Sequence, residues 1–160
     1  MPAEYFKYLP QNWRLYSLSL FNRVMADEAI REQWAVIFFS MLYKKSNIDD
    51  PENYRSIALI NTIVKTFTQI LLNRCMRWCE YNEIIPEFQS GFRRSRSCLD
   101  NIFVLNSIVQ FRLSRKASKL FCLFIDFRKA FPSADHMTLW TKLEHIGFSS
   151  KIIKILMSLY

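Results

Sequence analysis

The chain has 160 residues, 51% of them hydrophobic, which argues against a disordered chain and predicts one domain with a buried core. Its formal net charge of +8 favours a polyanionic partner, either nucleic acid or an anionic membrane surface, although a solvated basic face is an equal alternative. The N-terminus lacks the features of a signal peptide and the longest apolar run is too short to span a bilayer. We therefore expect an intracellular protein, nuclear or cytoplasmic, that is not secreted and has no membrane partner.

The first third of the chain is expected to contain helices followed by a strand. Residues Tyr5 to Val24 mix aromatic residues with leucines and predict a helix, and Asp27 is a candidate N-cap for a short helix that ends at Trp34. The apolar run Ala35 to Tyr43 suits a buried strand better than a helix. The polar stretch from Ser46 to Tyr54 then predicts a loop.

Two amphipathic helices are expected in the middle of the chain, with a basic loop between them. Asn61 can cap the first helix, whose apolar residues recur at helical spacing and predict one buried face. These residues are Ile63, Val64, Phe67, Ile70, Leu71 and Trp78. The basic loop runs from Gln89 to Ser97 around Gly91, and Ser97 forms a capping box with Asp100 at the start of the second helix. The residues expected to face inward from that helix are Ile102, Phe103, Ile108 and Val109.

The last third is expected to begin with a strand and end with two helices. The continuous apolar run Leu120 to Ile125 predicts a strand that is covered on both faces. Residues Met137 to His145 and Ser149 to Tyr160 predict helices on either side of Gly147. No helix stop signal follows the last of these, so we expect the chain to be truncated. The predicted class is α/β, of the α+β kind.

A carboxylate comes directly after the predicted strand, within the sequence Phe124 to Phe131. Asp126 follows a buried apolar run, so it must be solvated by a cation, a metal ion or hydrogen bonds. Strand ends are also where mixed sheets place their sites. On these residues alone, a functional site is as well supported as an Asp126 that pairs with Lys129 or caps the next turn.

Four blocks of sequence occur in an order and at a spacing typical of one enzyme family. They are Trp34 to Lys45, Asp50 to Leu59, Gln89 to Ser97, and Phe124 to Phe131. Together they resemble the conserved blocks of the reverse transcriptases of non-LTR retrotransposons, of the LINE and jockey-like kind. The resemblance implies a partial reverse transcriptase domain over 1–160. Residues 1–33 would form a helical lead-in, 34–119 helix-rich fingers, and 120–160 the first strand and helices of a right-hand polymerase palm.

The resemblance implies roles for residues around the expected active site. Asp126 matches the first catalytic carboxylate of the palm, and Phe127 would offer its backbone carbonyl to one of two Mg²⁺ ions. Phe131 matches the aromatic steric gate that favours deoxynucleotides, with core packing as the alternative. Three basic residues match positions of the fingers that neutralise the incoming triphosphate; they are Lys44, Lys45 and Arg55. The alternative role for Lys44 and Lys45 is only to keep the end of the strand soluble. For Arg55 it is a salt bridge to an acidic residue at 49, 50 or 52.

The resemblance also implies a loop that lies against the template strand. Its matching residues are Gln89, Gly91, Phe92, Arg93, Arg94 and Arg96. The arginines would bind phosphates, and Gly91 would allow a close approach of the backbone to nucleic acid. Phe92 would stack on a base or anchor the loop in the core.

The chain departs from the family pattern in several places. Ser56, Ser95 and Pro132 stand where the family usually has Pro or Gly, Gly, and Asp respectively. The paired aspartates of the family are not found, because Asp49 and Asp50 fall at the wrong place in the order. We therefore expect an incomplete two-ion site and a chain that is inactive by itself.

The resemblance implies an RNA template, a DNA primer and a deoxynucleoside triphosphate as partners, together with the remainder of the palm and the thumb. Two alternatives stay open. The chain is a nucleic-acid-binding remnant without catalysis, or it is the product of a truncated open reading frame without function.

Overall fold

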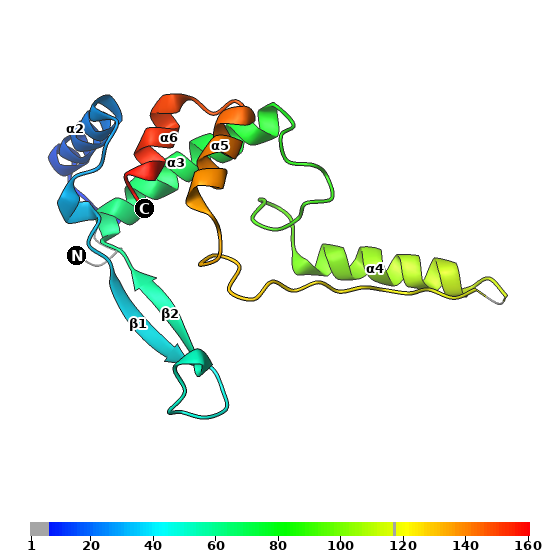
Figure 1. Ribbon diagram of the computed structural model, residues 1–160. Helices are drawn as coiled ribbons and strands as arrows, with labels where there is room; N and C mark the ends of the chain where they lie inside the picture. The colour runs from blue at the N-terminus through cyan, green and yellow to red at the C-terminus, as the bar shows by residue number, and fades with distance from the viewer. Residues whose placement is uncertain (1–6, 117) are drawn as a thin grey trace. The chain divides into compact units, whose positions relative to one another are not determined.

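The computed structural model describes residues 7–116 and 118–160 and is mostly helical, with one two-stranded antiparallel sheet (Figure 1). The expected mixed α/β class is therefore confirmed. The chain divides into two compact units. Unit 1 contains the chain up to Arg77 together with Asp135–Tyr160, and unit 2 is Trp78–Ala134. None of the helices in the described residues combines the length and the apolar character needed to cross a lipid bilayer.

The first helix of unit 1, α2, spans Gln11–Asp27. It confirms the expected helix from Gln11 to Val24. The described residues Tyr8 to Pro10 precede the helix and are not part of it, and residues 5 and 6 lie outside the described part of the chain. The expected N-cap at Asp27 is wrong, because this residue is still helical and pairs with Arg23 one turn earlier, at 3.6 Å. The helix ends at Asp27, because the next residue, Glu28, has a left-handed φ of 56°. Only the short 3₁₀ helix η1, Glu32–Trp34, follows before the first strand.

A β-hairpin follows η1. Its strands are β1, Phe38–Tyr43, and β2, Tyr54–Leu59, and their register runs from Phe38 opposite Leu59 to Tyr43 opposite Tyr54. The loop between them contains the 3₁₀ helix η2, Pro51–Asn53, so the loop expected there is confirmed. The strand expected at Ala35 to Tyr43 is also confirmed, but its expected burial is wrong, because every residue of β1 is exposed. A sheet of only two strands has no second layer of its own, so both of its faces stay open to solvent.

The long helix α3, Thr62–Tyr81, follows the hairpin. Asn61 caps it through its side-chain oxygen, which accepts a hydrogen bond from the backbone amide of Ile63 at 3.1 Å. Val64, Phe67 and Leu71 are buried at successive turns of the helix. The predicted cap and buried face are therefore confirmed.

The hydrophobic core lies in unit 1, around Phe67. The ring of Phe67 packs 5.4 Å from the ring of Phe21 and 5.8 Å from the ring of Trp34, measured between centroids. The buried cluster consists of Phe21, Val24, Trp34, Val64, Phe67, Leu71 and Ile155. Helices α2 and α3 and the 3₁₀ helix η1 thus share one core with the C-terminal helix.

The end of the chain closes this core. Helices α5, His136–His145, and α6, Ser150–Met157, confirm the two helices expected there, although α6 ends before Tyr160. Gly147 has a φ of 98°, which explains the glycine between them. Helix α6 is tied to the end of α2 by the ion pair of Lys154 with Glu28, at 2.7 Å. The hydroxyl of Ser158 also accepts a hydrogen bond from the amide of Ile30 at 3.1 Å.

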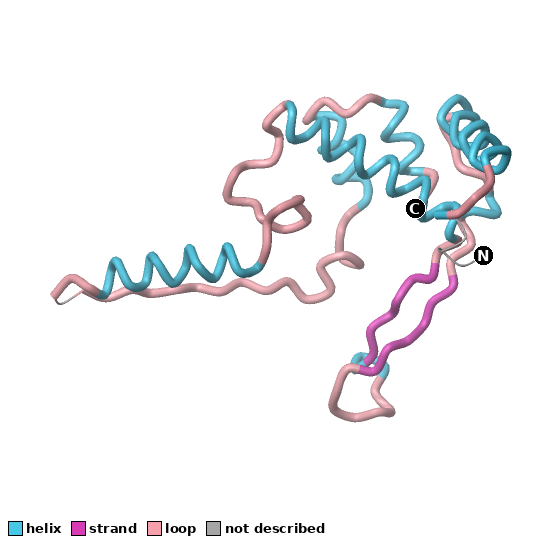
Figure 2. The backbone as a smooth tube through the Cα atoms, turned by 180° about the vertical axis from the view of Figure 1, so that it is seen from behind, coloured by secondary structure: helices cyan, strands magenta, loops and turns pink. Residues whose placement is uncertain are grey.

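Unit 2 contains helix α4, Cys98–Leu113, whose capping box between Ser97 and Asp100 is confirmed. Its expected inward face is wrong, because Ile102, Phe103 and Ile108 are exposed and Val109 is only half-buried. The described part of unit 2 consists largely of this one long helix and an extended segment, so it offers no core in which such a face could be buried. Figure 2 shows that extended segment returning alongside α4, as Figure 1 does from the other side.

That extended segment includes Leu120 to Ile125, and the strand expected there is wrong. The residues are extended but form no ladder, and Phe121, Leu123 and Phe124 are exposed. A strand needs a hydrogen-bonded neighbour, and in the described residues the only strand pair is β1 with β2. High strand propensity alone has therefore produced an extended segment without a sheet.

Candidate nucleic-acid interface

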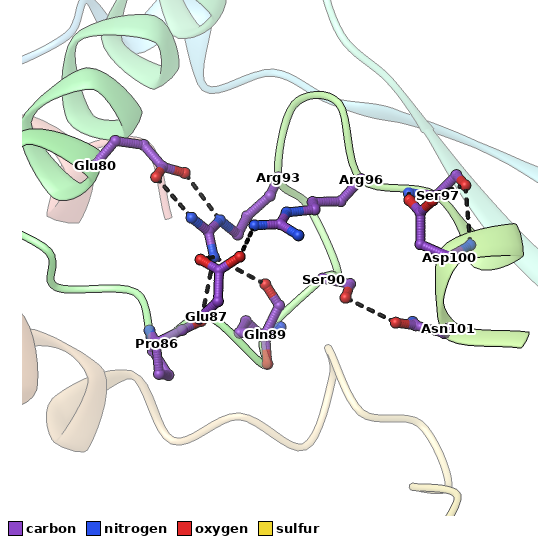
Figure 3. Close-up of polar contacts among 10 residues, drawn as sticks. All are labelled: Glu80, Pro86, Glu87, Gln89, Ser90, Arg93, Arg96, Ser97, Asp100 and Asn101. Carbon is purple, nitrogen blue, oxygen red and sulfur yellow. Dashed lines mark hydrogen bonds and ion pairs between the residues drawn. The ribbon is translucent and has the colours of Figure 1, made fainter. Parts of the chain in front are cut away.

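The predicted template loop, Gln89 to Ser97, joins α3 to α4 within unit 2 and is organised around Arg93 (Figure 3). The guanidinium of Arg93 forms a two-pronged ion pair with Glu80 near the end of α3. Its Nε donates to Oε1 of Glu80 at 3.0 Å, and its Nη2 donates to Oε2 at 2.8 Å. Such a fork fixes the orientation of both side chains as well as their distance. The side chain of Arg93 is consequently only 9% exposed.

The remaining amino group of Arg93 holds the backbone of the loop. Its Nη1 donates to the carbonyl of Pro86 at 3.2 Å and to that of Gln89 at 3.5 Å, and it lies 3.7 Å from Oε2 of Glu87. Glu87 also pairs with Arg96. Two arginines of the loop therefore face two carboxylates that precede the loop in the chain, so much of the local charge is compensated within unit 2.

The pKa values of the central pair shift in the directions that this geometry requires. The hydrogen bonds from Arg93 lower the pKa of the Glu80 carboxyl, and Glu80 in turn raises the pKa of the Arg93 guanidinium. Both groups stay charged over the whole physiological pH range. The interaction is therefore a permanent feature of the loop and not a pH-dependent one.

The backbone of the loop adopts an uncommon conformation at two non-glycine residues. Phe92 has a φ of 63° and Ser95 a φ of 58°, both in the left-handed region. The second value explains why the family resemblance places a glycine where Ser95 stands. At Gly91 a side chain would meet a neighbour, because an added Cβ would lie 3.3 Å from Nε2 of Gln89.

The ring of Phe92 is exposed and not anchored in a core. It makes an edge-to-face contact with the ring of Phe131, with 6.2 Å between centroids and an interplanar angle of 81°. Arg94 is also exposed on this loop. The structure thus brings two of the predicted site residues into contact, one from the template loop and one from the predicted nucleotide site.

Asp126 and Phe127 lie in the exposed extended segment of unit 2. Within the described residues, the Asp126 carboxylate takes part in no hydrogen bond or ion pair, so neither the pairing with Lys129 nor the capping role is observed. Residues 7–116 and 118–160 also contain no cluster of three or more His, Cys, Asp or Glu that could hold a metal ion. One carboxylate beside one backbone carbonyl does not fit the two-ion site of a polymerase.

The predicted triphosphate contacts lie in unit 1, at the turn end of the hairpin. Arg55 is in β2, opposite Leu42, and Lys44 follows β1 directly, with its amide bonded to the carbonyl of Asn53 at 2.8 Å. Both side chains are exposed, as is that of Lys45. These three cations therefore share one end of the hairpin, whereas the template loop, Asp126, Phe127 and Phe131 belong to unit 2.

Sequence reasoning missed Glu80 and Glu87, the two carboxylates that organise the loop. Glu80 lies on the solvent side of a predicted helix, 13 residues before Arg93, and nothing in its immediate surroundings marks it as a partner. The available signal was the charge pattern, because Glu87 is an acidic residue next to a loop with three arginines. Such a pattern can indicate internal pairing as well as an anion-binding surface.

Comparison with known proteins gives the chain a family. Residues 42–160 match the family described as reverse transcriptase (RNA-dependent DNA polymerase). Curated relatives from Drosophila melanogaster include the probable RNA-directed DNA polymerase from transposon X-element, 31% identical over 86% of this chain and 15% of the relative. The probable polymerase from transposon BS is 27% identical over 88% of this chain and 16% of the relative. The polymerase from mobile element jockey is 25% identical over 86% of this chain and 15% of the relative.

The chain thus spans about 15% of the length of the curated relatives that it matches. No solved structure matches it significantly. The family match covers most of the chain and includes the hairpin end, the template loop and Asp126. The chain therefore belongs to the reverse transcriptase family, and it is related to the RNA-directed DNA polymerases of the non-LTR retrotransposons X-element, BS and jockey.

Proposed function

We propose that the chain is the fingers and the first part of the palm of an RNA-directed DNA polymerase, and that its template loop contacts nucleic acid. Residues 1–33 would be the lead-in, 34–119 the fingers and 120–160 the beginning of the palm. The observation that carries the proposal is the family match over residues 42–160, which includes a basic loop with an ordered internal structure. The partners are an RNA template, a DNA primer and a deoxynucleoside triphosphate.

The proposed contact with the template is made by five residues of the loop other than Arg93. Gln89, Gly91 and Phe92 would meet the strand through backbone approach and stacking. Arg94 and Arg96 would contact phosphates. Arg96 also pairs with Glu87, so a phosphate there would share it or displace the carboxylate.

Binding to a single-stranded RNA oligonucleotide, measured between about 50 and 200 mM salt, tests this proposal. For the unaltered chain, the logarithm of the affinity should fall linearly with the logarithm of the salt concentration. Replacing Arg94 by Ala should make the slope shallower by about 0.7, because one phosphate contact is lost. Arg74→Ala is the matched control, because Arg74 is an exposed arginine of α3 outside the loop. A flat salt dependence, or an equal effect of the two substitutions, would contradict the proposal.

For the nucleotide site we propose that Lys44, Lys45 and Arg55 contact the triphosphate and that Phe131 is the steric gate. Asp126, with the carbonyl of Phe127, would supply one carboxylate to Mg²⁺. The described residues do not complete a site for this ion, so no step of the reaction is assigned to it here. We expect no template-directed incorporation by the 160-residue chain. Primer extension above the level of an Asp126→Ala variant would overturn that expectation.

A second candidate is a nucleic-acid-binding module without catalysis. It is favoured by the contrast between the ordered loop and the open surroundings of Asp126. Salt-dependent RNA binding without primer extension would agree with it. The third possibility is a chain without function. Such a chain would show no RNA binding, no primer extension and no sharp, reversible thermal unfolding.

A further inference from the structure

We propose that Arg93 is a positioning residue of the template loop and not a phosphate ligand. Through its fork with Glu80 it holds the neighbouring Phe92 against the proposed steric gate, Phe131. This inference rests on the proposed function of the loop and of Phe131. It goes beyond the family resemblance, which implies a phosphate contact for every arginine of the loop.

The first step of the argument is that the guanidinium of Arg93 is already occupied. One edge, formed by Nε and Nη2, faces both oxygens of Glu80 at 3.0 and 2.8 Å. Nη1 donates to the carbonyls of Pro86 and Gln89. A phosphate could reach this group only by displacing a carboxylate that already has the geometry of the best arginine partner. The side chain is also only 9% exposed, which leaves little room for a strand of nucleic acid.

The second step concerns charge. Glu80 and Glu87 lie within 2.8 and 3.7 Å of the guanidinium nitrogens of Arg93. A polyanion that approaches Arg93 would therefore also approach two carboxylates, and their repulsion would offset the attraction of the arginine. In a phosphate-binding site the positive charges are not neutralised by neighbouring carboxylates, whereas here Glu80 and Glu87 neutralise Arg93.

The third step concerns Phe92, the residue immediately before Arg93. An aromatic residue at a φ of 63° is uncommon, because a left-handed conformation brings Cβ close to the following carbonyl oxygen. Such residues persist where the surroundings fix them more firmly than the residue's own preference does. Arg93 provides this constraint, because one side chain ties α3 to two carbonyls of the loop.

The fourth step connects the loop to nucleotide selection. The exposed ring of Phe92, on this fixed backbone, meets the ring of Phe131 in an edge-to-face arrangement. In the proposed site Phe131 excludes a 2′-hydroxyl, and a gate of this kind selects only if its ring keeps its place. We infer that Phe92 buttresses Phe131, and that the pair of Glu80 with Arg93 sets the position of the buttress.

Fluorine NMR of the full chain tests the clamp directly, with 4-fluorophenylalanine introduced at position 92. The reference is the resonance shift that Phe131→Leu abolishes, because this shift reports the contact between the rings. We expect Glu80→Gln, Arg93→Gln and Arg93→Lys each to abolish it as well, since none of them can form the fork. A double variant with Glu80→Gln and Arg93→Gln should lose no more of the resonance shift than either single variant, because both substitutions act through one interaction. Glu83→Gln, an exposed acidic residue nearby, should leave the signal unchanged.

RNA binding supplies a second measurement, in which the clamp role and the phosphate-ligand role of Arg93 predict opposite effects of Glu80→Gln on affinity. If Arg93 is a clamp, Glu80→Gln weakens RNA binding as Arg93→Gln does, and neither changes the salt slope. If Arg93 is a phosphate ligand, Glu80→Gln strengthens binding, Arg93→Gln lowers the slope by about 0.7, and Arg93→Lys retains it. That second pattern, or an unchanged fluorine signal in Glu80→Gln, would overturn the proposal. If the unaltered chain binds no RNA, the proposed function fails while the fluorine measurement still decides on the clamp.

Discussion

Replacing Phe67 by Ala should remove a large part of the stability of unit 1. Phe67 is 1% exposed and its ring contacts two others, those of Phe21 and Trp34, at 5.4 and 5.8 Å. A buried aromatic side chain removes about 150–250 Å² from water, which at about 25 cal/mol per Å² sets an upper limit of roughly 4–6 kcal/mol. Truncations of this kind cost about 3–5 kcal/mol, including the cavity that remains. We expect a loss of about 4 kcal/mol and, for a unit of roughly 100 residues, a midpoint of thermal unfolding lower by roughly 16–32 °C.

Urea unfolding followed by near-ultraviolet circular dichroism measures this loss, because Trp34 packs on the deleted ring. The matched control is Leu72→Ala, in the same helix, where the residue is 51% exposed. That variant should lose less than about 1 kcal/mol. Equal losses in the two variants would refute the assignment of the core to this face of the helix.

Three further predictions concern the ends of helices. Gly147→Ala should destabilise unit 1 by about 1–2 kcal/mol, measured by urea unfolding, because the φ of 98° disfavours a Cβ. Ser97→Ala should cost about 1 kcal/mol of helix stability and lower the amide exchange protection of the first turn of α4, because Asp100 loses its capping partner; equal protection in both chains would contradict this. The hydroxyl and amide of Thr138 lower the pKa of the Asp135 carboxyl, so its contribution to stability is present above its ordinary pKa and is lost as the pH falls through the lowered value. Unfolding midpoints between about pH 6 and pH 2 should therefore depend less on pH in Asp135→Asn, which keeps the cap but does not titrate.

The parts of the fold that the sequence predicted well are those that local chemistry decides. The caps at Asn61 and Ser97 need only residues within three positions of themselves, and both were predicted correctly. The buried face of α3 follows from helical spacing, because a continuous apolar stripe has few other uses. The hairpin strand at Phe38 to Tyr43 was also predicted, although not its exposure.

The errors occurred where the outcome depends on a partner elsewhere in the chain. The run Leu120 to Ile125 has the composition of a buried strand, but composition does not provide the neighbouring strand that hydrogen bonding requires. The prediction that the apolar side of α4 faces inward was wrong for the same reason. Asp27 was a valid capping residue by type, yet the helix before it extended through it because Phe21 and Val24 pack into the core from that helix.

The candidate site shows the same division. The position and basic character of the template loop could be predicted, whereas the partner of Arg93 could not. Glu80 lies one helix earlier in the chain and is paired through the geometry of the connecting turn. Residue type identified Arg93 as an anion-binding side chain, and only the structure assigned a carboxylate to it.

The tie between the two ends of unit 1 has a consequence for synthesis on the ribosome. Ser158 accepts its hydrogen bond from a residue 128 positions earlier, and Ile155 belongs to the same cluster as Phe21. Translation proceeds at about 5–20 residues per second, so α2 must wait roughly 6 to 25 seconds before its last packing partner has been made. During that interval Phe21 can already pack on Trp34 and Phe67, but the side of the core that Ile155 covers stays open.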